Sequence, residues 1–394
     1  MHMADALVSP AVAVTMYAAS AAAAGVSLVQ LHKEEAAAPE LAKKKLPTMA
    51  VMSALVFAGQ MINYTIPGTG SSGHLCGGML LSAILGPWAG FLSMIVILAI
   101  QALFFADGGL LVLGANVWNM AFYGCFVGYF LIYRPLMQGK LLSGKGRTKL
   151  VLASVLGCVV TLQLGALSVA VETSLSGITA LPFGAFAALM QPIHLAIGLV
   201  EGGITAAVLL FVYQTRPELL QCASASGAKN RCSRRATLAI LAAAALVIGG
   251  GLSLLASSNP DGLEWSLFGN EEAGYSANMG LDEEAYGAES AAAEKAAAVQ
   301  EKTSLLPDYN FDGSDSAAGT SVSGLVGCAL VAALAAIISL AGRAARKRSG
   351  KKRTVSSTNL EPRSFFSRSW RSAVRDSISF SQSMESRMMR NWKW

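Results

Sequence analysis

The sequence predicts an all-α, polytopic membrane protein, and three observations support this: the composition, the apolar runs and the placement of charge. Hydrophobic residues make up 53% of the 394 residues, and charged residues only 14%. Several apolar runs reach the roughly 18–20 residues that a helix needs to cross a hydrocarbon core of about 30 Å. Length alone would suggest two or three soluble domains, and this composition argues against them.

Seven apolar stretches are long enough to be spanning helices. They lie at residues 8–31, 48–66, 109–133, 149–171, 187–213, 237–257 and 322–342. Residues 75–106 are too long for one helix and contain Gly86-Pro87, where proline removes a backbone donor and disfavours helix in the residue before it. We expect two short helices there, returning to the side on which they began. The sequence leaves open whether this pair crosses the bilayer twice or is re-entrant.

The basic residues predict the orientation. They gather at 43–45, 134–149, 216–235 and 343–353. Loops rich in Lys and Arg stay cytoplasmic, so all four lie inside if 75–106 crosses an even number of times. The protein is then expected in the plasma membrane, with its N-terminus outside and its C-terminus in the cytoplasm.

The start of the chain is predicted to be an uncleaved anchor. A secretory leader normally has positive charge before its apolar run, and no Lys or Arg precedes Leu7. Cleavage among the small residues within 1–24 is the alternative. The basic group at 43–45 favours an anchor whose N-terminus is outside.

Changes in composition divide the chain into four parts. Residues 1–216 form a membrane domain, 217–236 a basic cytoplasmic linker, 237–342 a two-helix module, and 343–394 a basic cytoplasmic tail. An acidic outer loop at 258–320 contains 13 Asp or Glu against two Lys. The tail contains 14 Lys or Arg against three acidic residues.

Met1 and His2 form a candidate metal chelate. The free α-amine, the His2 backbone nitrogen and the His2 Nδ1 close a five-membered and a six-membered ring on one ion, which Nε2 cannot reach. The amide nitrogen must lose its proton, which favours Ni(II) or Cu(II). Met1 is expected to stay, because its removal normally requires a small second residue.

His74, in IPGTGSSGHLCGG, is the best candidate for a fourth donor. Of the four histidines, His32 falls in a cytoplasmic loop and His194 within a helix, whereas His74 is predicted on the same side as the N-terminus. The glycines around it allow the backbone to pass close to an ion. The alternatives are a chance histidine at position 2 and a hydrogen-bonded loop histidine at position 74.

Four stretches resemble the signatures of the CbiM/NikM family: MHMADALVSP, FAGQMINYTIPGTGSSGHLCGG, DGGLLVLGANVWNMAFYG and HLAIGLVEGGITAAV. The resemblance covers roughly residues 1–213. It implies the substrate-capture component of an energy-coupling-factor importer for cobalt or nickel, with a bundle of about seven helices like that of other such S components. It also implies that the N-terminal segment enters the bundle and that Met1, His2 and His74 hold the ion. The implied partners are a transmembrane coupling (T) component and two cytoplasmic ATPases.

The second module resembles the PDGLE-type accessory N component. PDGLEW at 260–265 opens the acidic loop, and LLPDY at 305–309 closes it. The resemblance implies that capture and accessory components are fused in one chain, the second being two helices with a large extracytoplasmic loop. The excess of acidic residues would raise the local cation concentration only weakly through physiological salt.

The expected cargo is Co²⁺ or Ni²⁺, carried as substrate, with no prosthetic group. Amide-nitrogen coordination favours nickel. The resemblance points slightly to cobalt, as the more common role of the fused arrangement, and cobalt would supply cobalamin synthesis.

Polar residues within the membrane domain are candidates to support the metal site, since buried polar groups in lipid are costly and face the bundle interior. Asn116 and Asn119 either hold the N-terminal segment in place or bond helix to helix. His194 and Glu201 share a helical face, and helix–helix contact away from the metal is favoured for both. The remaining candidates for support of the site are Asp5, Gln60 and Asn63.

Enzymatic chemistry is not expected. The six cysteines form no CxxC pair, and the acidic loop has none, so neither a disulfide framework nor a thiolate metal site is indicated. Residues 139–146 match most of a P-loop, but Gly146 stands where a Ser or Thr must bind Mg²⁺. ATP hydrolysis is therefore expected only in the partner ATPases.

The basic tail at 343–394 mixes Arg with aromatic residues, which fits a segment lying on anionic lipid or a disordered end. No nucleic-acid-binding pattern accompanies it. Two other functions have some support: a membrane metal sensor or scaffold with the tail as its output, and an intramembrane enzyme using Asn116, His194 and Glu201. Neither explains why both outer histidines fall in the family stretches.

Overall fold

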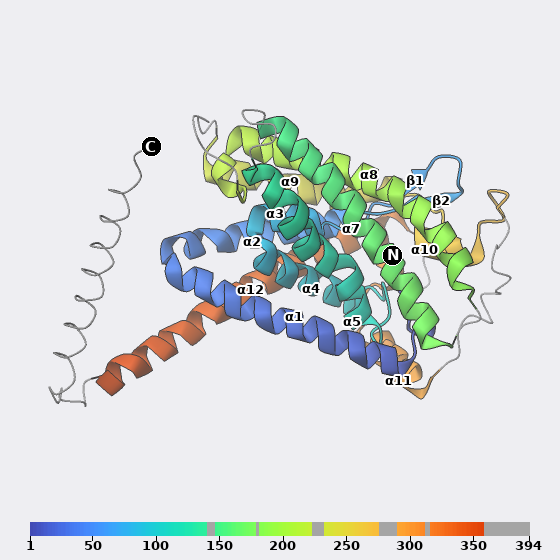
Figure 1. The fold of residues 1–394 in the computed structure, drawn as a ribbon, viewed down its shortest axis with the longest axis horizontal. Helices are drawn as coiled ribbons and strands as arrows, with labels where there is room; N and C mark the ends of the chain where they lie inside the picture. Colours follow the sequence, from blue (N-terminus) through green and yellow to red (C-terminus); the bar gives the residue numbers. More distant parts are fainter. Residues whose placement is uncertain (140–145, 179–180, 223–231, 276–289, 312–315, 358–394) are drawn as a thin grey trace, which may run out of the picture. The chain divides into compact units, whose positions relative to one another are not determined.

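The computed structural model is almost entirely helical, with one short β-hairpin, and it confirms the all-α fold class (Figure 1). It describes residues 1–139, 146–178, 181–222, 232–275, 290–311 and 316–357, without side chains at 41–44 and 338–357. The chain divides into a compact unit, Met1–Leu340, and a second unit, Ala341–Trp394. Of the second unit, only the backbone of a helix ending at Ser357 is described.

Long helices occupy each of the predicted spans. They are α1 (Pro10–Ala37), α2 (Pro39–Gln60), α4 (Pro87–Phe104), α7 (Gly146–Ser176), α8 (Phe183–Thr215), α9 (Arg234–Gly250) and α12 (Ala317–Ser357). Between α4 and α7, one nearly continuous helix consists of α5 (Leu113–Asn116), η2 (Val117–Tyr133) with the wider turns of a π-helix, and α6 (Arg134–Gln138). Proline begins α1, α2 and α4, where its missing N–H costs nothing.

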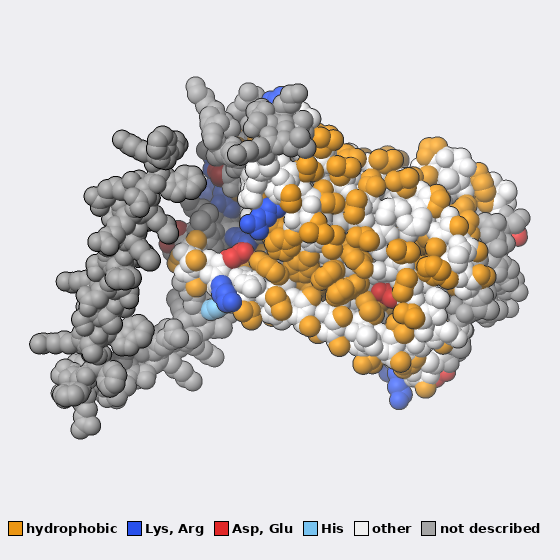
Figure 2. All heavy atoms as spheres, viewed as in Figure 1, with side chains coloured by type: hydrophobic (Ala, Val, Ile, Leu, Met, Phe, Trp, Pro, Cys, Tyr) orange, Lys and Arg blue, Asp and Glu red, His pale blue; other side chains and the backbone are white. Residues whose placement is uncertain are grey.

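Six helices of the described residues are long and apolar enough to cross a membrane: α1, α4, Leu113–Gln138, α7, α8 and the Ala317–Ile337 part of α12. Helices α2 and α9 lie at predicted spans but fall short of this measure, because α2 carries the lysines at 43–45 and α9 has only 17 residues. Figure 2 shows hydrophobic side chains over most of the described part of one face. Leucine, valine and isoleucine side chains of α7 and α8 are exposed in this way, as expected of a surface in contact with lipid.

Residues 75–106 form two helices, as predicted. The first, α3 (Gly78–Leu85), is joined to α4 at Gly86, whose φ is +85°. With eight residues, α3 is only about 12 Å long and cannot span the bilayer. Its far end is bonded by Gln221, whose backbone N–H donates to the Ala83 carbonyl at 2.8 Å. Helix α4 then leads back to Asp107, at the same end as the N-terminus.

A β-hairpin replaces the end of the predicted 48–66 span. Strands β1 (Tyr64–Ile66) and β2 (Ser71–Gly73) pair antiparallel, with Tyr64 opposite Gly73. The turn between them uses Gly68 and Gly70, both with positive φ. His74 follows β2 directly, so the hairpin determines where that side chain begins.

The acidic segment between α9 and α12 is not simply a solvated loop. It contains α10 (Gly262–Phe268), α11 (Ala291–Thr303) and the short turn η6 (Pro307–Tyr309). Gln300 of α11 donates to the carbonyls of Ala102 and Gly108, each at 2.8 Å. Helix α10 packs on α8 and β2, and α9 packs on α2. The second module therefore covers the end of the bundle where the N-terminus lies (Figure 1).

Short turns complete the described chain: η1 (Asp5–Leu7), η3 (Pro217–Leu219) and η4 (Leu252–Leu255). The core of the P-loop-like stretch, 140–145, lies outside the described residues. So do 223–231 of the linker, 276–289 and 312–315 of the acidic segment, and the tail from 358.

Candidate metal-binding site

The first residues of the chain run extended into the bundle and are buried there. Met1 is 4% exposed and Met3 is fully buried. The Met1 α-amine lies 3.2 Å from Nε2 of His74. The rings of His2 and His74 stack, with their centroids 5.1 Å apart. The structure thus brings together the three residues that the sequence predicts as metal ligands.

Two residues of the loop and helix after α4 bond the Met3 backbone, and we call Gly109 and Asn116 the Met3 cradle. Asn116 Oδ1 accepts from the Met3 N–H at 2.8 Å, and its Nδ2 donates to the Met3 carbonyl at 3.2 Å. The Gly109 N–H donates to the same carbonyl at 3.0 Å. A Cβ at Gly109 would lie 1.8 Å from Asp5 Oδ1, so a larger residue does not fit there.

Asn119 has a different role from Asn116. Its Nδ2 donates to Glu172 of α7 at 2.8 Å and reaches Met3 only through the sulfur, at 3.6 Å. Of the two uses that the sequence leaves open, Asn116 holds the N-terminal segment and Asn119 mainly bonds helix to helix.

Gln60 links the surroundings of both histidines. Its Nε2 donates to the Cys76 carbonyl at 2.8 Å, two residues after His74. Its Oε1 accepts from Gln101 at 3.0 Å, and Gln101 Oε1 lies 3.3 Å from His2 Nε2. Gln101 is a supporting residue that we did not predict, although a buried glutamine in an apolar span is itself a sign of a polar interior contact.

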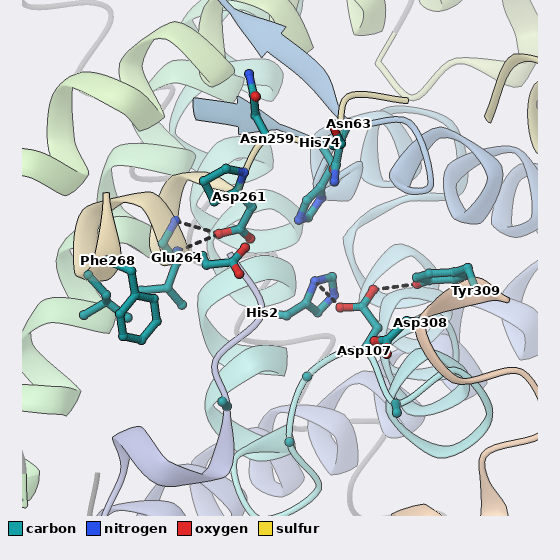
Figure 3. A pocket seen from close by; sticks show the side chains of 18 of the residues that line it. His2, Asn63, His74, Asp107, Asn259, Asp261, Glu264, Phe268, Asp308 and Tyr309 are labelled. Carbon is teal, nitrogen blue, oxygen red and sulfur yellow. Dashed lines mark hydrogen bonds and ion pairs between the residues drawn. The ribbon is translucent and has the colours of Figure 1, made fainter. Parts of the chain in front are cut away.

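Asp5 and Asn63 lie at the edge of the site. Asp5 Oδ1 accepts from the Val112 N–H at 3.1 Å and so attaches the N-terminal segment to the loop between α4 and α5. Asn63 lines a cavity near His74 (Figure 3). Its carbonyl accepts from the Ser257 N–H of the second module at 2.7 Å. These contacts position chain segments, not the proposed donors themselves.

Two carboxylates, neither predicted as a site residue, contact the predicted donor atoms, and Figure 3 shows the contact between Asp107 and His2. Asp261 Oδ2 lies 2.6 Å from the Met1 amine. Asp107 Oδ1 lies 3.1 Å from His2 Nδ1, and Asp107 Oδ2 accepts from the Tyr309 hydroxyl at 2.5 Å. Asp261 comes from PDGLEW and Tyr309 from LLPDY, so both ends of the acidic segment reach the site.

Burial lowers the pKa of both imidazoles and so favours their neutral forms. It lowers the pKa of His2, although Asp107 acts in the opposite direction. Burial also lowers the pKa of His74 to about 3, aided by the N-terminal ammonium and His2. Burial alone would raise the pKa of Asp261, but the ammonium and His74 hold it well below its usual value. Neutral imidazoles have the free lone pair that a metal requires.

A cavity of about 1480 Å³ lies over these groups. Its described lining carries six acidic side chains and no Lys or Arg. The acidic residues are Asp5, Asp107, Asp261, Glu264, Glu271 and Asp308. His2 and His74 line the same cavity, so both imidazoles lie beside this negatively charged surface.

His194 and Glu201 lie closer to the site than expected. His194 Nδ1 donates to the Met190 carbonyl at 2.8 Å, while its buried Nε2 has no partner among the described residues. His194 lines a second cavity, of about 10 Å³, together with Met1 and His74. Glu201 accepts from the N–H groups of Cys76 and Gly77, at 2.8 and 2.9 Å, and so fixes the chain just after His74.

Side chains alone do not form a metal site here. Within the described part of the chain, no three His, Cys, Asp or Glu side chains are grouped so that they could hold an ion. The six cysteines, all in described segments, are free.

Comparison with known proteins gives two adjoining family matches. Residues 2–219 match the CbiM model, described as the cobalt uptake substrate-specific transmembrane region. Residues 235–344 match the PDGLE domain.

Similar proteins include nickel and cobalt transport proteins. The putative fused nickel transport protein NikMN of Archaeoglobus fulgidus is 33% identical over 85% of this chain and 96% of its own. The cobalt transport protein CbiM of Sorangium cellulosum is 36% identical over 44% of this chain and 76% of its own. A crystal structure of a truncated transition metal transporter aligns at 35% identity with a TM-score of 0.45, over 54% of this chain and 98% of that one.

The CbiM model covers more than half of the chain, and the Archaeoglobus relative aligns through both modules. These relatives are transport proteins and not enzymes. The chain is a multi-pass membrane protein that belongs to the CbiM family of cobalt and nickel transport components, and its CbiM region is followed by a PDGLE domain.

Proposed function

We propose that this chain is the metal-capture subunit of an energy-coupling-factor importer and binds Ni²⁺ or Co²⁺ at its N-terminus. The donors are the Met1 amine, the His2 amide nitrogen, His2 Nδ1 and His74 Nε2. The main support is the buried Met1 amine, 3.2 Å from His74 Nε2 and in the chain next to His2.

The distances suit a shared ion. First-row divalent ions bind nitrogen at about 2.0–2.1 Å, so two donors at right angles lie about 3 Å apart. The Met1 amine and His74 Nε2 are at this separation. His2 Nδ1 is in contact with Asp107 instead, and a bound ion would replace that contact. His2 Nε2 stays with Gln101, as expected when the other ring nitrogen binds a metal.

Nickel is the better-supported cargo, which reverses the slight preference for cobalt drawn from the sequence. The fused relatives in Archaeoglobus fulgidus and Lactiplantibacillus plantarum are both named nickel transport proteins. The relatives named for cobalt align with half of this chain or less. A deprotonated amide donor points the same way.

The proposal also covers the domains, their orientation in the membrane and the partner proteins. The capture domain is 1–216, the linker 217–236, and the accessory module 237–342, followed by the tail at 343–394. The N-terminus and the acidic segment face outside, and the basic segments face the cytoplasm. A transmembrane coupling protein and two ATPases supply the energy. Copurification of these three proteins with the chain, and ATP-dependent nickel uptake by the assembly, test this part.

The metal site is tested with the full-length protein and its native first residue. We would titrate Ni²⁺ and Co²⁺ by calorimetry and absorbance against a variant with one Leu inserted between Met1 and His2, since a bulky second residue keeps Met1 in place. The insertion keeps both side chains but breaks the two-ring chelate. A Leu inserted after Gly177, between α7 and α8, is the control.

We expect the wild type and the control to bind nickel tightly with a planar-nitrogen absorption band, and the Met1–His2 insertion to lose both. Equal binding by the two insertion variants would show that the N-terminal chelate is wrong.

A further inference from the structure

We infer that Asp261, in the PDGLEW turn of the second module, is a positioning residue that holds the Met1 amine in place for the metal. The inference rests on the proposed function, since it concerns one of the donors assigned there. It gives the accessory module a direct chemical part in metal capture.

The contact between Asp261 and the amine is close and largely buried. Asp261 Oδ2 lies 2.6 Å from the Met1 nitrogen, and the two side chains are 20% and 3% exposed. A charged amine in such a place needs a partner, because desolvation of an unpaired charge is strongly unfavourable. Asp261 is the carboxylate that contacts it in the described structure.

The carboxylate is itself held rigidly. Asp261 Oδ1 accepts from the N–H groups of Leu263 and Glu264, at 2.8 and 2.9 Å, as the N-cap of α10. This leaves Oδ2 directed at the amine. A side chain fixed by its own backbone contacts can orient a ligand without first losing its freedom.

The turn that carries Asp261 is also attached to the strand that leads to His74. The Ser72 N–H donates to the Pro260 carbonyl at 2.8 Å, and the Ser72 hydroxyl donates to the Asn259 carbonyl at 2.7 Å. One rigid connection therefore runs from the amine through Asp261 and Pro260 to β2. It sets the spacing between two proposed donors that come from opposite ends of the first 74 residues.

Metal binding does not require this contact to break. An amine coordinated through its lone pair keeps N–H bonds, and one of them can still donate to Asp261 Oδ2. A donor set of one deprotonated amide and three neutral nitrogens carries one negative charge, so Asp261 also balances the second charge of the ion. Asp107 differs, because it contacts His2 Nδ1, the proposed donor atom itself.

The test compares Asp261→Asn and Asp308→Asn in the full-length protein. Asn is as good an N-cap as Asp, so Asp261→Asn removes the charge and keeps the fold of α10. Asp308 lines the same cavity, and its positive φ of 50° suits Asn. Asp308→Asn therefore removes one charge from the cavity without touching the Met1 amine. Asp261→Glu tests rescue by a longer carboxylate.

We expect Asp261→Asn to weaken Ni²⁺ binding by about 10–100-fold, the usual effect of losing a group that orients a ligand. At saturating nickel its absorption band should match the wild type, because Asp261 positions a donor and is not one. Asp261→Glu should bind more tightly than Asp261→Asn, and Asp308→Asn as the wild type does.

Equal weakening by the Asp261 and Asp308 substitutions would overturn the inference and leave only a general effect of charge. So would wild-type affinity of Asp261→Asn, or an altered absorption band. If the Met1–His2 insertion abolishes binding in the same experiments, the proposed function survives that result. If the insertion also binds normally, the proposed function itself fails.

Discussion

Two sets of contacts hold the first three residues of this chain, and they do so in different ways. The Met3 cradle of the membrane domain bonds only backbone groups of Met3. Asp261 and Asp107 instead contact the proposed donors, Met1 and His2. The contacts to the Met3 backbone can remain whether or not a metal is bound. The contacts of Asp261 and Asp107 involve the proposed donors themselves and so affect metal binding directly. Loss of the cradle should therefore be the more severe defect.

Gly109→Ala gives the strongest test of this comparison. Its Cβ would lie 1.8 Å from Asp5 Oδ1 and 2.6 Å from the Asp5 nitrogen, so the N-terminal segment must move. We expect nickel affinity in calorimetric titration to fall by about 100-fold or more, beyond the usual range for a lost supporting contact. Gly184→Ala, which meets no atom within 4 Å, is the matched control. Equal binding by the two variants would mean that the cradle is not needed.

Asn116→Ala removes both side-chain bonds to Met3 and leaves the helix intact. We expect a loss of about 10–100-fold in nickel affinity, measured in the same way. Asn119→Ala should weaken binding less, because Asn119 bonds mainly Glu172. A larger effect at Asn119 would contradict the separate roles assigned to the two asparagines.

Acid stability tests the buried state of His74. Its pKa falls from 6.5 to about 3 on folding, so between these values the unfolded chain binds a proton that the folded chain does not. Stability should then decrease as pH falls through this window, by up to about 1.4 kcal/mol per pH unit. The lowered pKa of Asp261 acts only below its ordinary value of 3.8.

The measurement is the unfolding midpoint of the metal-free protein between about pH 7 and pH 5. His74→Gln should show the shallower dependence, although not a flat one, because the pKa of His2 is lowered too. If the unfolding midpoints of the wild type and of His74→Gln depend on pH to the same extent, His74 is in a more polar environment than the structure shows.

Tyr309→Phe should have the smallest effect on binding. It removes the hydroxyl that donates to Asp107 but keeps the ring stacked on Phe105, 4.8 Å away. We expect nickel affinity to change by no more than about fivefold, the equivalent of one hydrogen bond of about 1 kcal/mol. A loss as large as that of Asp261→Asn would show that the accessory module acts as strongly through His2 as through Met1.

Much of this arrangement could be predicted from the sequence, and the rest depends on contacts between distant segments. The apolar runs predict the helices because the bilayer requires them, and chelate geometry with the expected side of the membrane predicts that Met1, His2 and His74 lie together, as they do. Asp261 and Gln101 could not be assigned to the site, because no local pattern says which donor a distant polar residue will meet. The β-hairpin is not predicted, because β1 lies within an apolar run that reads as part of a helix.

The contact between Met1 and Asp261 joins residues 260 positions apart on one polypeptide. In a chain that carries both modules, their meeting is intramolecular, and flexible tethers typically give effective concentrations of about the millimolar range. Two separate proteins at cellular concentrations would need a higher affinity for each other to be bound to the same extent. Fusion therefore supplies one carboxylate for each amine. The interface between the two modules does not need to bind tightly.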